Sequence, residues 1–174
     1  TLLCDLFLGD VERLSARAPV YVEEAERRGD LYMLSNLLVW HMPMAHLCRG
    51  DAGEASRSVE AGLRCWPHAG FHMQHHLGLL ALTWTDLYRG DGVSAERRVL
   101  ARLSAMKASL ILRSHAVRVP IEDLVGRCAL AASDGTGAPS EAALRTAARA
   151  AGRLEREQIP HAGAMAHMLR GAVA

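Results

Sequence analysis

Three copies of "RGD" and one further Gly-Asp pair set the spacing of this chain. The tripeptide occupies 28–30, 49–51 and 89–91, and the fourth pair stands at 9–10. The pairs at 9, 50 and 90 are about 40 residues apart. Because Gly ends helices in the left-handed conformation and Asp caps the next helix start, this spacing predicts turns between helices. An adhesive Arg-Gly-Asp motif is the alternative, but three copies in register with a repeat are better explained by capping.

Each of these turns is expected to contain one Gly at a helix exit and one Asp at the next helix entry. The arginine before the Gly would complement the negative C-terminal end of the helix dipole. The eight predicted structural cap residues are Gly9, Asp10, Gly29, Asp30, Gly50, Asp51, Gly90 and Asp91.

The segments between the turns have helical periodicity. One apolar stripe contains Leu31, Leu34, Leu37, Leu38 and Met42, at the three- and four-residue spacing of one helix face. No segment alternates convincingly with the period of two that a strand requires. The predicted helices are 2–8, 11–28, 31–48, 52–66, 70–89, 93–106, 108–131, 139–157 and 161–171.

The fold class predicted from these features is all-α, with antiparallel helix pairs stacked as a tetratricopeptide-like α-solenoid. The phase of the repeat supports this: "CRGDAGEASRSVEAGL" and "YRGDGVSAERRVLARL" place a small Ala five residues after the Gly in both copies. These segments resemble the turn and second helix of tetratricopeptide repeats. The period is longer than that family's, and the characteristic pattern of its first helix is missing, so the expectation is a tetratricopeptide-like repeat.

The chain is expected to form a single helical-repeat domain over 1–174. The repeat core would cover 1–133, a loop 133–139, and Ala-rich terminal helices 140–174. Prolines at 19, 43 and 120 are expected to kink or split their helices. The start at Thr1, without an initiator Met, suggests a fragment of a longer protein.

Composition narrows the function classes. The formal net charge of +1 gives no general attraction to nucleic acid or to an anionic membrane, and no apolar run reaches the roughly 18 residues that a membrane span needs. The four cysteines are scattered without paired metal-ligand spacing, as in proteins of a reducing compartment. We therefore expect a cytoplasmic protein that binds neither nucleic acid nor membrane.

Three longer stretches carry a family resemblance. They are "RRGDLYMLSNLL", "HAGFHMQHHLGLLALTWTDLYRGDG" and "LVGRCALAAS". They resemble the C-terminal helical region of large bacterial serine/threonine protein kinases of the myxobacterial or planctomycete type, over roughly 1–133. In those signalling proteins a kinase domain, often followed by an ATPase module, precedes a tetratricopeptide-like tail.

The resemblance implies a non-catalytic, regulatory region that binds a protein or peptide. The kinase or ATPase domain of the same chain is one candidate partner. No kinase Gly-rich loop, catalytic loop or metal-binding Asp motif occurs in the sequence, so this region is expected to be no enzyme and to need no cofactor. The alternative is a small-molecule-sensing helical domain, as in ATPase-type transcription regulators.

The densest polar feature is "FHMQHH" at 71–76. His72 and His76 have the i, i+4 spacing that can place two imidazoles on one metal ion, but no Glu accompanies them in a zinc-hydrolase pattern, and helix packing or surface exposure is the favoured interpretation. No metal site is therefore predicted.

If the helices 31–48, 70–89 and 108–131 line a concave face, they would present a groove for an acidic or phosphorylated peptide. Binding there would weaken as pH rises through about 6.5, where unperturbed histidine loses its charge. The candidate binding residues are His41, His72, His75, His76, Arg113 and His115.

Overall fold

The computed structural model describes residues 1–132 and 139–174, and every regular element in these ranges is helical. The predicted all-α class is therefore confirmed, whereas the predicted loop at 133–139 falls almost entirely outside the described residues. The chain divides into two compact units, Thr1–Tyr88 and Arg89–Ala174. This boundary lies at the third RGD turn, and the single helical-repeat domain over 1–174 stays a prediction.

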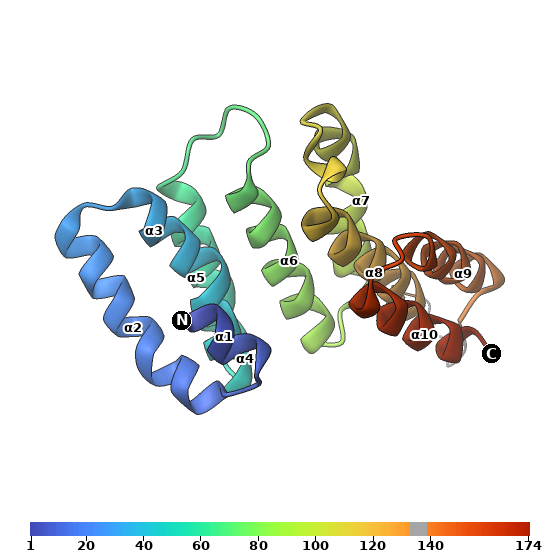
Figure 1. The fold of residues 1–174 in the computed structure, drawn as a ribbon, viewed down its shortest axis with the longest axis horizontal. Helices are drawn as coiled ribbons and strands as arrows, with labels where there is room; N and C mark the ends of the chain where they lie inside the picture. Colours follow the sequence, from blue (N-terminus) through green and yellow to red (C-terminus); the bar gives the residue numbers. More distant parts are fainter. Residues whose placement is uncertain (133–138) are drawn as a thin grey trace. The chain divides into compact units, whose positions relative to one another are not determined.

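Unit 1 is a succession of helices in which the chain reverses at each short connection (Figure 1). Within it α4 packs on α5, and α5 packs on α6. Its elements are α1 (Leu2–Phe7), α2 (Val11–Arg28), α3 (Leu31–Asn36), the π-helical turn η1 (Leu37–His41), α4 (Met42–Cys48), α5 (Ala52–Arg64) and α6 (Met73–Tyr88).

Unit 2 follows the same principle, with α8 packed between α7 and α9, and α10 packed on α9. Its elements are α7 (Gly92–Ala108), the 3-10 turn η2 (Ile111–Arg113), α8 (His115–Ala132), α9 (Glu141–Glu155) and α10 (Pro160–Val173).

The Gly-Asp pairs form the turns that their spacing predicts. All four glycines have φ between 67° and 80°, the left-handed region that a glycine adopts without steric cost. Each aspartate is the N-cap of the next helix, and its carboxylate accepts the backbone N–H three residues later. The acceptor–donor pairs are Asp10 with Arg13, Asp30 with Met33, Asp51 with Glu54, and Asp91 with Ser94.

The predicted helix 31–48 is interrupted by a π turn just before Pro43. The Met42 N–H bonds to the Leu37 carbonyl, five residues back, and Pro43 has no N–H with which to continue this pattern to Leu38. The Ser58 hydroxyl of α5 donates to the Leu38 carbonyl instead, at 2.7 Å. Of the three predicted proline effects, a split occurs here, while α2 and α8 run through Pro19 and Pro120 without interruption.

Two predicted helices begin later than expected. The segment 65–72 is a non-helical connection that contains Gly70 at φ 79°, so α6 starts at Met73 and not at residue 70. Leu110 adopts φ 59°, which ends α7 and separates it from α8. The sequence predicts a helix boundary at 107, but the observed break extends to residue 114, so α8 starts at His115 and not at residue 108.

The buried alanines after the repeated turns occupy equivalent positions in the two units. Ala55 and Val59 of α5, and Ala95 and Val99 of α7, are all fully or almost fully buried. A small residue followed four positions later by a larger one therefore faces the packed side of both helices, as the phase of the repeat predicts.

Candidate functional site

The connection between α5 and α6 gathers two of the predicted histidines against a tryptophan. Trp66 Nε1 donates a hydrogen bond to His72 Nδ1 at 3.0 Å, and the His72 backbone N–H donates to His75 Nδ1 at 3.0 Å. The turn through Gly70 brings the chain back so that residue 72 reaches residue 66. These contacts fix both imidazole rings at the start of α6.

Two further rings complete what we call the aromatic cluster, comprising Tyr32, Trp66, Phe71, His72 and His75. The Tyr32 and Trp66 centroids are 5.9 Å apart in an edge arrangement, and those of Phe71 and His75 are 5.7 Å apart. The His72 and His75 centroids are 5.5 Å apart. Tyr32 is 61% exposed and the other four are half-buried, so the cluster reaches the surface.

The hydrogen bonds determine what the two imidazoles can offer to a ligand. Each Nδ1 accepts an N–H, so it carries a lone pair, and in the neutral ring the proton then sits on Nε2. An Nε2–H group is a donor for a carbonyl or carboxylate oxygen, whereas a metal ion would need the lone pair of that nitrogen. The geometry favours hydrogen-bond donation over metal binding, and the described part of the chain holds no group of three His, Cys, Asp or Glu residues that could bind a metal.

His41 and His76 differ from this pair because their Nδ1 atoms are buried. His76 is 1% exposed, and the Nδ1 atoms of both rings have no hydrogen-bond partner among the described residues. Burial lowers the pKa of His76 to about 4 and also lowers the pKa of His41. Desolvation disfavours the protonated ring, so both histidines should gain their charge at a lower pH than an unperturbed histidine, and His76 only near pH 4.

The two remaining predicted binding residues lie in unit 2. Arg113 is exposed, and its carbonyl accepts a hydrogen bond from Arg118 at 3.1 Å. The His115 ring pairs with the Glu157 carboxylate. Of the six predicted binding residues, the structure thus brings His72 and His75 into contact, leaves His76 buried and His41 half-buried, and pairs the His115 ring with Glu157.

Glu157 is an anionic centre that sequence reasoning missed. Arg118 donates to both of its carboxylate oxygens, with Nη2–Oε2 at 2.7 Å. This hydrogen bonding is the main cause that lowers the Glu157 pKa to about 2, and His115 contributes further. The residues lie about 40 positions apart in the chain, so no local pattern could have revealed the cluster.

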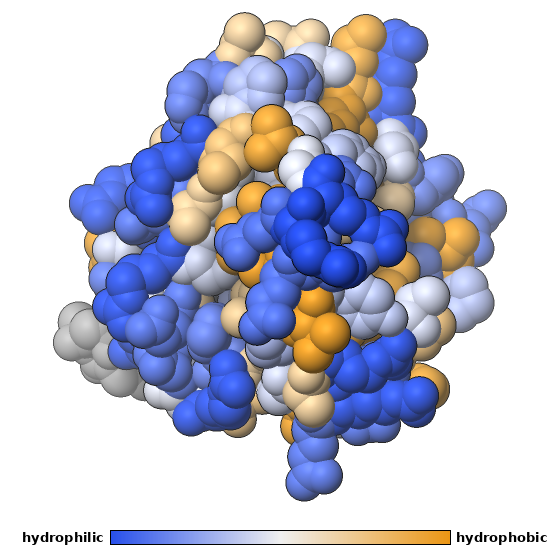
Figure 2. All heavy atoms as spheres, turned by 90° about the vertical axis from the view of Figure 1, so that its left-hand side faces the viewer, coloured by the Kyte–Doolittle hydropathy of each residue, from blue (hydrophilic) through white to orange (hydrophobic). Residues whose placement is uncertain are grey.

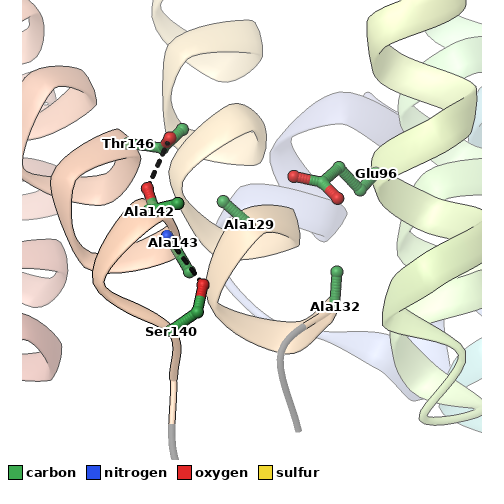
Figure 3. Close-up of a pocket in the computed structure, with 7 residues that line it drawn as sticks. All are labelled: Glu96, Ala129, Ala132, Ser140, Ala142, Ala143 and Thr146. Carbon is green, nitrogen blue, oxygen red and sulfur yellow. Dashed lines mark hydrogen bonds between the residues drawn. The ribbon is translucent and has the colours of Figure 1, made fainter. Parts of the chain in front are cut away.

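Unit 2 also has two surface hollows. One, of about 240 Å³, is lined mainly by alanines of α8 and α9, with the Glu96 carboxylate facing them from α7 (Figure 3). Ser140 and Thr146 on its wall already bond to α9 backbone atoms. The other, of about 280 Å³, lies on α7 and is lined by three arginines, Ser94 and Ala101.

Exposed hydrophobic residues are spread over the surface. On the face shown in Figure 2 they form several separate groups among hydrophilic residues. In the described ranges, no helix combines the length and the apolar character that crossing a bilayer demands.

Comparison of the chain with protein-family models, with curated proteins and with solved structures finds no match. The assignment of function therefore depends on the geometry of the chain itself.

Proposed function

We propose that this chain is a non-catalytic helical region that binds a protein or peptide, and that the aromatic cluster of unit 1 is a contact surface. The observation that carries the proposal is the exposed Tyr32 ring beside Trp66, with two imidazoles fixed next to them. Tyr and Trp are enriched among the residues that dominate binding energy at protein interfaces, because they offer large apolar area at low entropic cost.

The hydrogen-bond pattern of the cluster suits a peptide ligand. The rings supply apolar contact, and the His72 ring, whose Nδ1 accepts the Trp66 N–H, supplies an Nε2–H donor of the kind that a peptide carbonyl or carboxylate accepts. Since Trp66, His72 and the backbone restrain one another, little side-chain freedom is lost on binding. Such preorganisation favours affinity.

The finer assignment is a tetratricopeptide-like arrangement of antiparallel pairs. The capped Gly-Asp turns and the buried alanines at equivalent positions of α5 and α7 support it. A place behind the kinase domain of a bacterial serine/threonine kinase, in cytoplasmic signalling, rests on the sequence resemblance alone. Catalysis would then belong to other parts of that protein.

The small-molecule alternative could use either hollow of unit 2. Their volumes, about 280 Å³ and about 240 Å³, are below the roughly 300–1,000 Å³ of typical ligand pockets. The wall of the hollow beside Glu96 is mostly alanine, and its two hydroxyls bond to backbone atoms. Binding of a peptide at the surface is therefore the favoured function.

The test is selection of peptides from a random dodecapeptide library displayed on phage, with the 174-residue chain as bait. Binding of the selected peptides is then measured by fluorescence anisotropy for Tyr32→Ala and His75→Ala. We expect each variant to weaken binding about tenfold, as truncation of a central interface residue does.

The matched control is Tyr88→Ala, since Tyr88 belongs to the same unit and is 58% exposed. It should leave binding unchanged while the cluster variants do not. Failure to select any peptide would reject the proposed function. An equal loss in all three variants would reject the aromatic cluster as its site.

A further inference from the structure

The exposed side of α7 is basic. The helix carries one acidic residue, Glu96, and four basic residues. Three of these basic residues line the hollow of about 280 Å³ together with Ser94 and Ala101, namely Arg97, Arg98 and Arg102. We call this set the arginine hollow. It has no acidic residue on its wall, so its electrostatic potential is positive.

Two of these arginines lack the carboxylate partner that other arginines of unit 2 have. Arg118, Arg127, Arg153 and Arg170 each pair with an Asp or Glu. Among the described residues, Arg97 donates a hydrogen bond to the Ser94 hydroxyl at 3.1 Å, and no carboxylate forms an ion pair with Arg97 or Arg102. Their guanidinium donors remain available to an anion from outside.

The carboxylate that acts on the hollow from outside is Asp91. Its pKa is lowered first by the hydrogen bonds from Ser94, and then by the charges of Arg97 and Arg98. Asp91 is held as the N-cap of α7, where it accepts the Ser94 N–H at 3.0 Å. It therefore offsets part of the positive charge at one end without lining the hollow.

Exposed aliphatic residues flank the same face. Val93 is 62% exposed and Leu100 is 51% exposed. Val93 precedes Arg97 by four residues and Leu100 follows it by three, so all three lie along one side of the helix. Arginine combined with exposed apolar side chains is typical of protein interfaces, whereas the affinity of a surface for nucleic acid comes mainly from its positive charge.

We propose that the arginine hollow binds an acidic segment of a peptide or protein partner, whose carboxylate or phosphate groups pair with Arg97 and Arg102. An aliphatic residue of the segment would cover Val93 and Leu100. This inference rests on the proposed peptide-binding function and names the charge of the ligand. It places the contact on α7 of unit 2, on residues that do not belong to the aromatic cluster.

The planar guanidinium suits both anionic groups, since it donates two parallel hydrogen bonds to a carboxylate or a phosphate. Glutamate and phosphoserine side chains share this chemistry, so the experiment needs a probe for each. Three fluorescein-labelled dodecapeptides serve: one alternating Glu and Leu, one with phosphoserine in place of Glu, and one with Gln in place of Glu.

The experiment measures anisotropy of the three probes with the complete chain and with the double variant Arg97→Gln/Arg102→Gln. Gln keeps a high helix propensity, and a far-UV circular dichroism melt verifies the fold. We expect the Glu or phosphoserine probe to bind, the Gln probe to bind at least about tenfold more weakly, and the double variant to lose at least about tenfold in affinity.

The matched control is Arg149→Gln/Arg156→Gln, which removes the same charge from two exposed arginines. Arg149 lies in α9, and Arg156 directly follows this helix. It should retain affinity within about twofold if position, and not net charge, decides binding. Equal affinity of the Gln and Glu probes, or equal losses in both double variants, would overturn the inference. A single-stranded oligonucleotide that displaces the acidic probe at lower concentration than the unlabelled peptide would also overturn it, in favour of nucleic acid.

The failure of this inference is distinguishable from that of the proposed function. If phage-selected peptides lose affinity for the Tyr32→Ala variant and keep it for Arg97→Gln/Arg102→Gln, the proposed function is retained and the arginine hollow is not part of it. Absence of binding by every peptide class would remove both.

Discussion

The two units use different side chains to hold their helices together. All eight Phe, Trp and Tyr residues of the chain lie within residues 1–88. Unit 1 packs Trp84 and a set of leucines and methionines around its buried core. In unit 2, four of the seven buried residues in the core around Leu154 are alanines.

Ion pairs between helices, in contrast, are more prominent in unit 2 than in unit 1. In unit 2, Arg153 of α9 pairs with Glu122 of α8, and Arg170 of α10 pairs with Glu155 of α9. In unit 1, the Asp5 carboxylate pairs with Arg17 between α1 and α2, and hydroxyls such as Ser58 bond across helices to backbone carbonyls.

The difference shows two ways to stabilise helix pairs of similar length. Large side chains fill space between helices that stand apart, and they lose free energy when atoms are removed. Small residues allow close backbone approach, and such contacts lose free energy when atoms are added. Unit 1 should therefore be sensitive to truncation, and unit 2 to enlargement and to low pH.

The largest expected effect is truncation in unit 1. Leu14 of α2 is fully buried in the core, so Leu14→Ala should lower the free energy of unfolding by about 3 kcal/mol. Because every Trp belongs to unit 1, tryptophan fluorescence during urea unfolding reports on this unit. The control is Leu8→Ala at an exposed site, which should cost less than about 0.5 kcal/mol. A shift below 1 kcal/mol at Leu14 would contradict the packing account.

Enlargement in unit 2 should come next. A Cβ added to Gly92 would lie 2.3 Å from the backbone carbonyl of Ala131 in α8, and backbone atoms cannot rotate away. Gly92→Ala should therefore cost about 2 kcal/mol, seen as a shift of the circular dichroism transition that exceeds the shift of the tryptophan transition.

Gly163→Ala is the matched control, because an added Cβ meets no atom within 4 Å. Inside α10 it should stabilise by about 0.5–1 kcal/mol, through the lower helix propensity of glycine. If both variants behaved alike, the close approach of α7 and α8 would not be a stability determinant.

Low pH should weaken unit 2 through Glu157. Its folded pKa of about 2 lies below the ordinary 4.5, so the stabilisation is fully present above pH 4.5 and is lost as pH falls toward 2. Glu157→Gln should cost about 1–2 kcal/mol at pH 7, since hydrogen bonds to a charged group are replaced by neutral ones. Urea unfolding at several pH values should show the two proteins converging below pH 4.5. A constant difference down to pH 2.5 would contradict the role of the carboxylate charge.

Sequence reasoning succeeded where the determinant is local. A Gly followed by Asp specifies a left-handed exit and a cap within a few residues, so the four turns and most helix ends followed from spacing. Leu110 and Gln158 adopt φ of 59° and 55°. The periodicity predicts helix boundaries at 107 and at 158–160, close to both residues, but not their left-handed backbone, because non-glycine residues rarely adopt positive φ.

The candidate site was harder to predict because apolar periodicity does not reveal which side of a buried helix faces solvent. His72 and His75 meet at the end of a connection, and that contact depends on the turn through Gly70. His76 belongs to the same stretch of sequence, but it lies on the buried side of α6. The arginines at 97 and 102 were visible in the sequence, but their lack of a carboxylate partner among the described residues could be seen only from the fold.

The smallest expected effect concerns the left-handed glycines of the Gly-Asp turns. Gly50 and Gly90 end helices at φ of 80° and 76°, and an L-residue at either position is strained by about 1 kcal/mol in the left-handed conformation. An added Cβ meets no atom within 4 Å at Gly90, and only the Tyr88 hydroxyl at 3.7 Å at Gly50, so strain alone is changed. Gly50→Ala and Gly90→Ala should therefore each cost about 1 kcal/mol, in contrast to the unequal responses of the two cores. Urea unfolding followed by circular dichroism measures both, and Asn at the same positions should recover part of the loss because it tolerates positive φ better than Ala. Wild-type stability of both alanine variants would mean that the repeated turn is set by its flanking helices and not by its glycine.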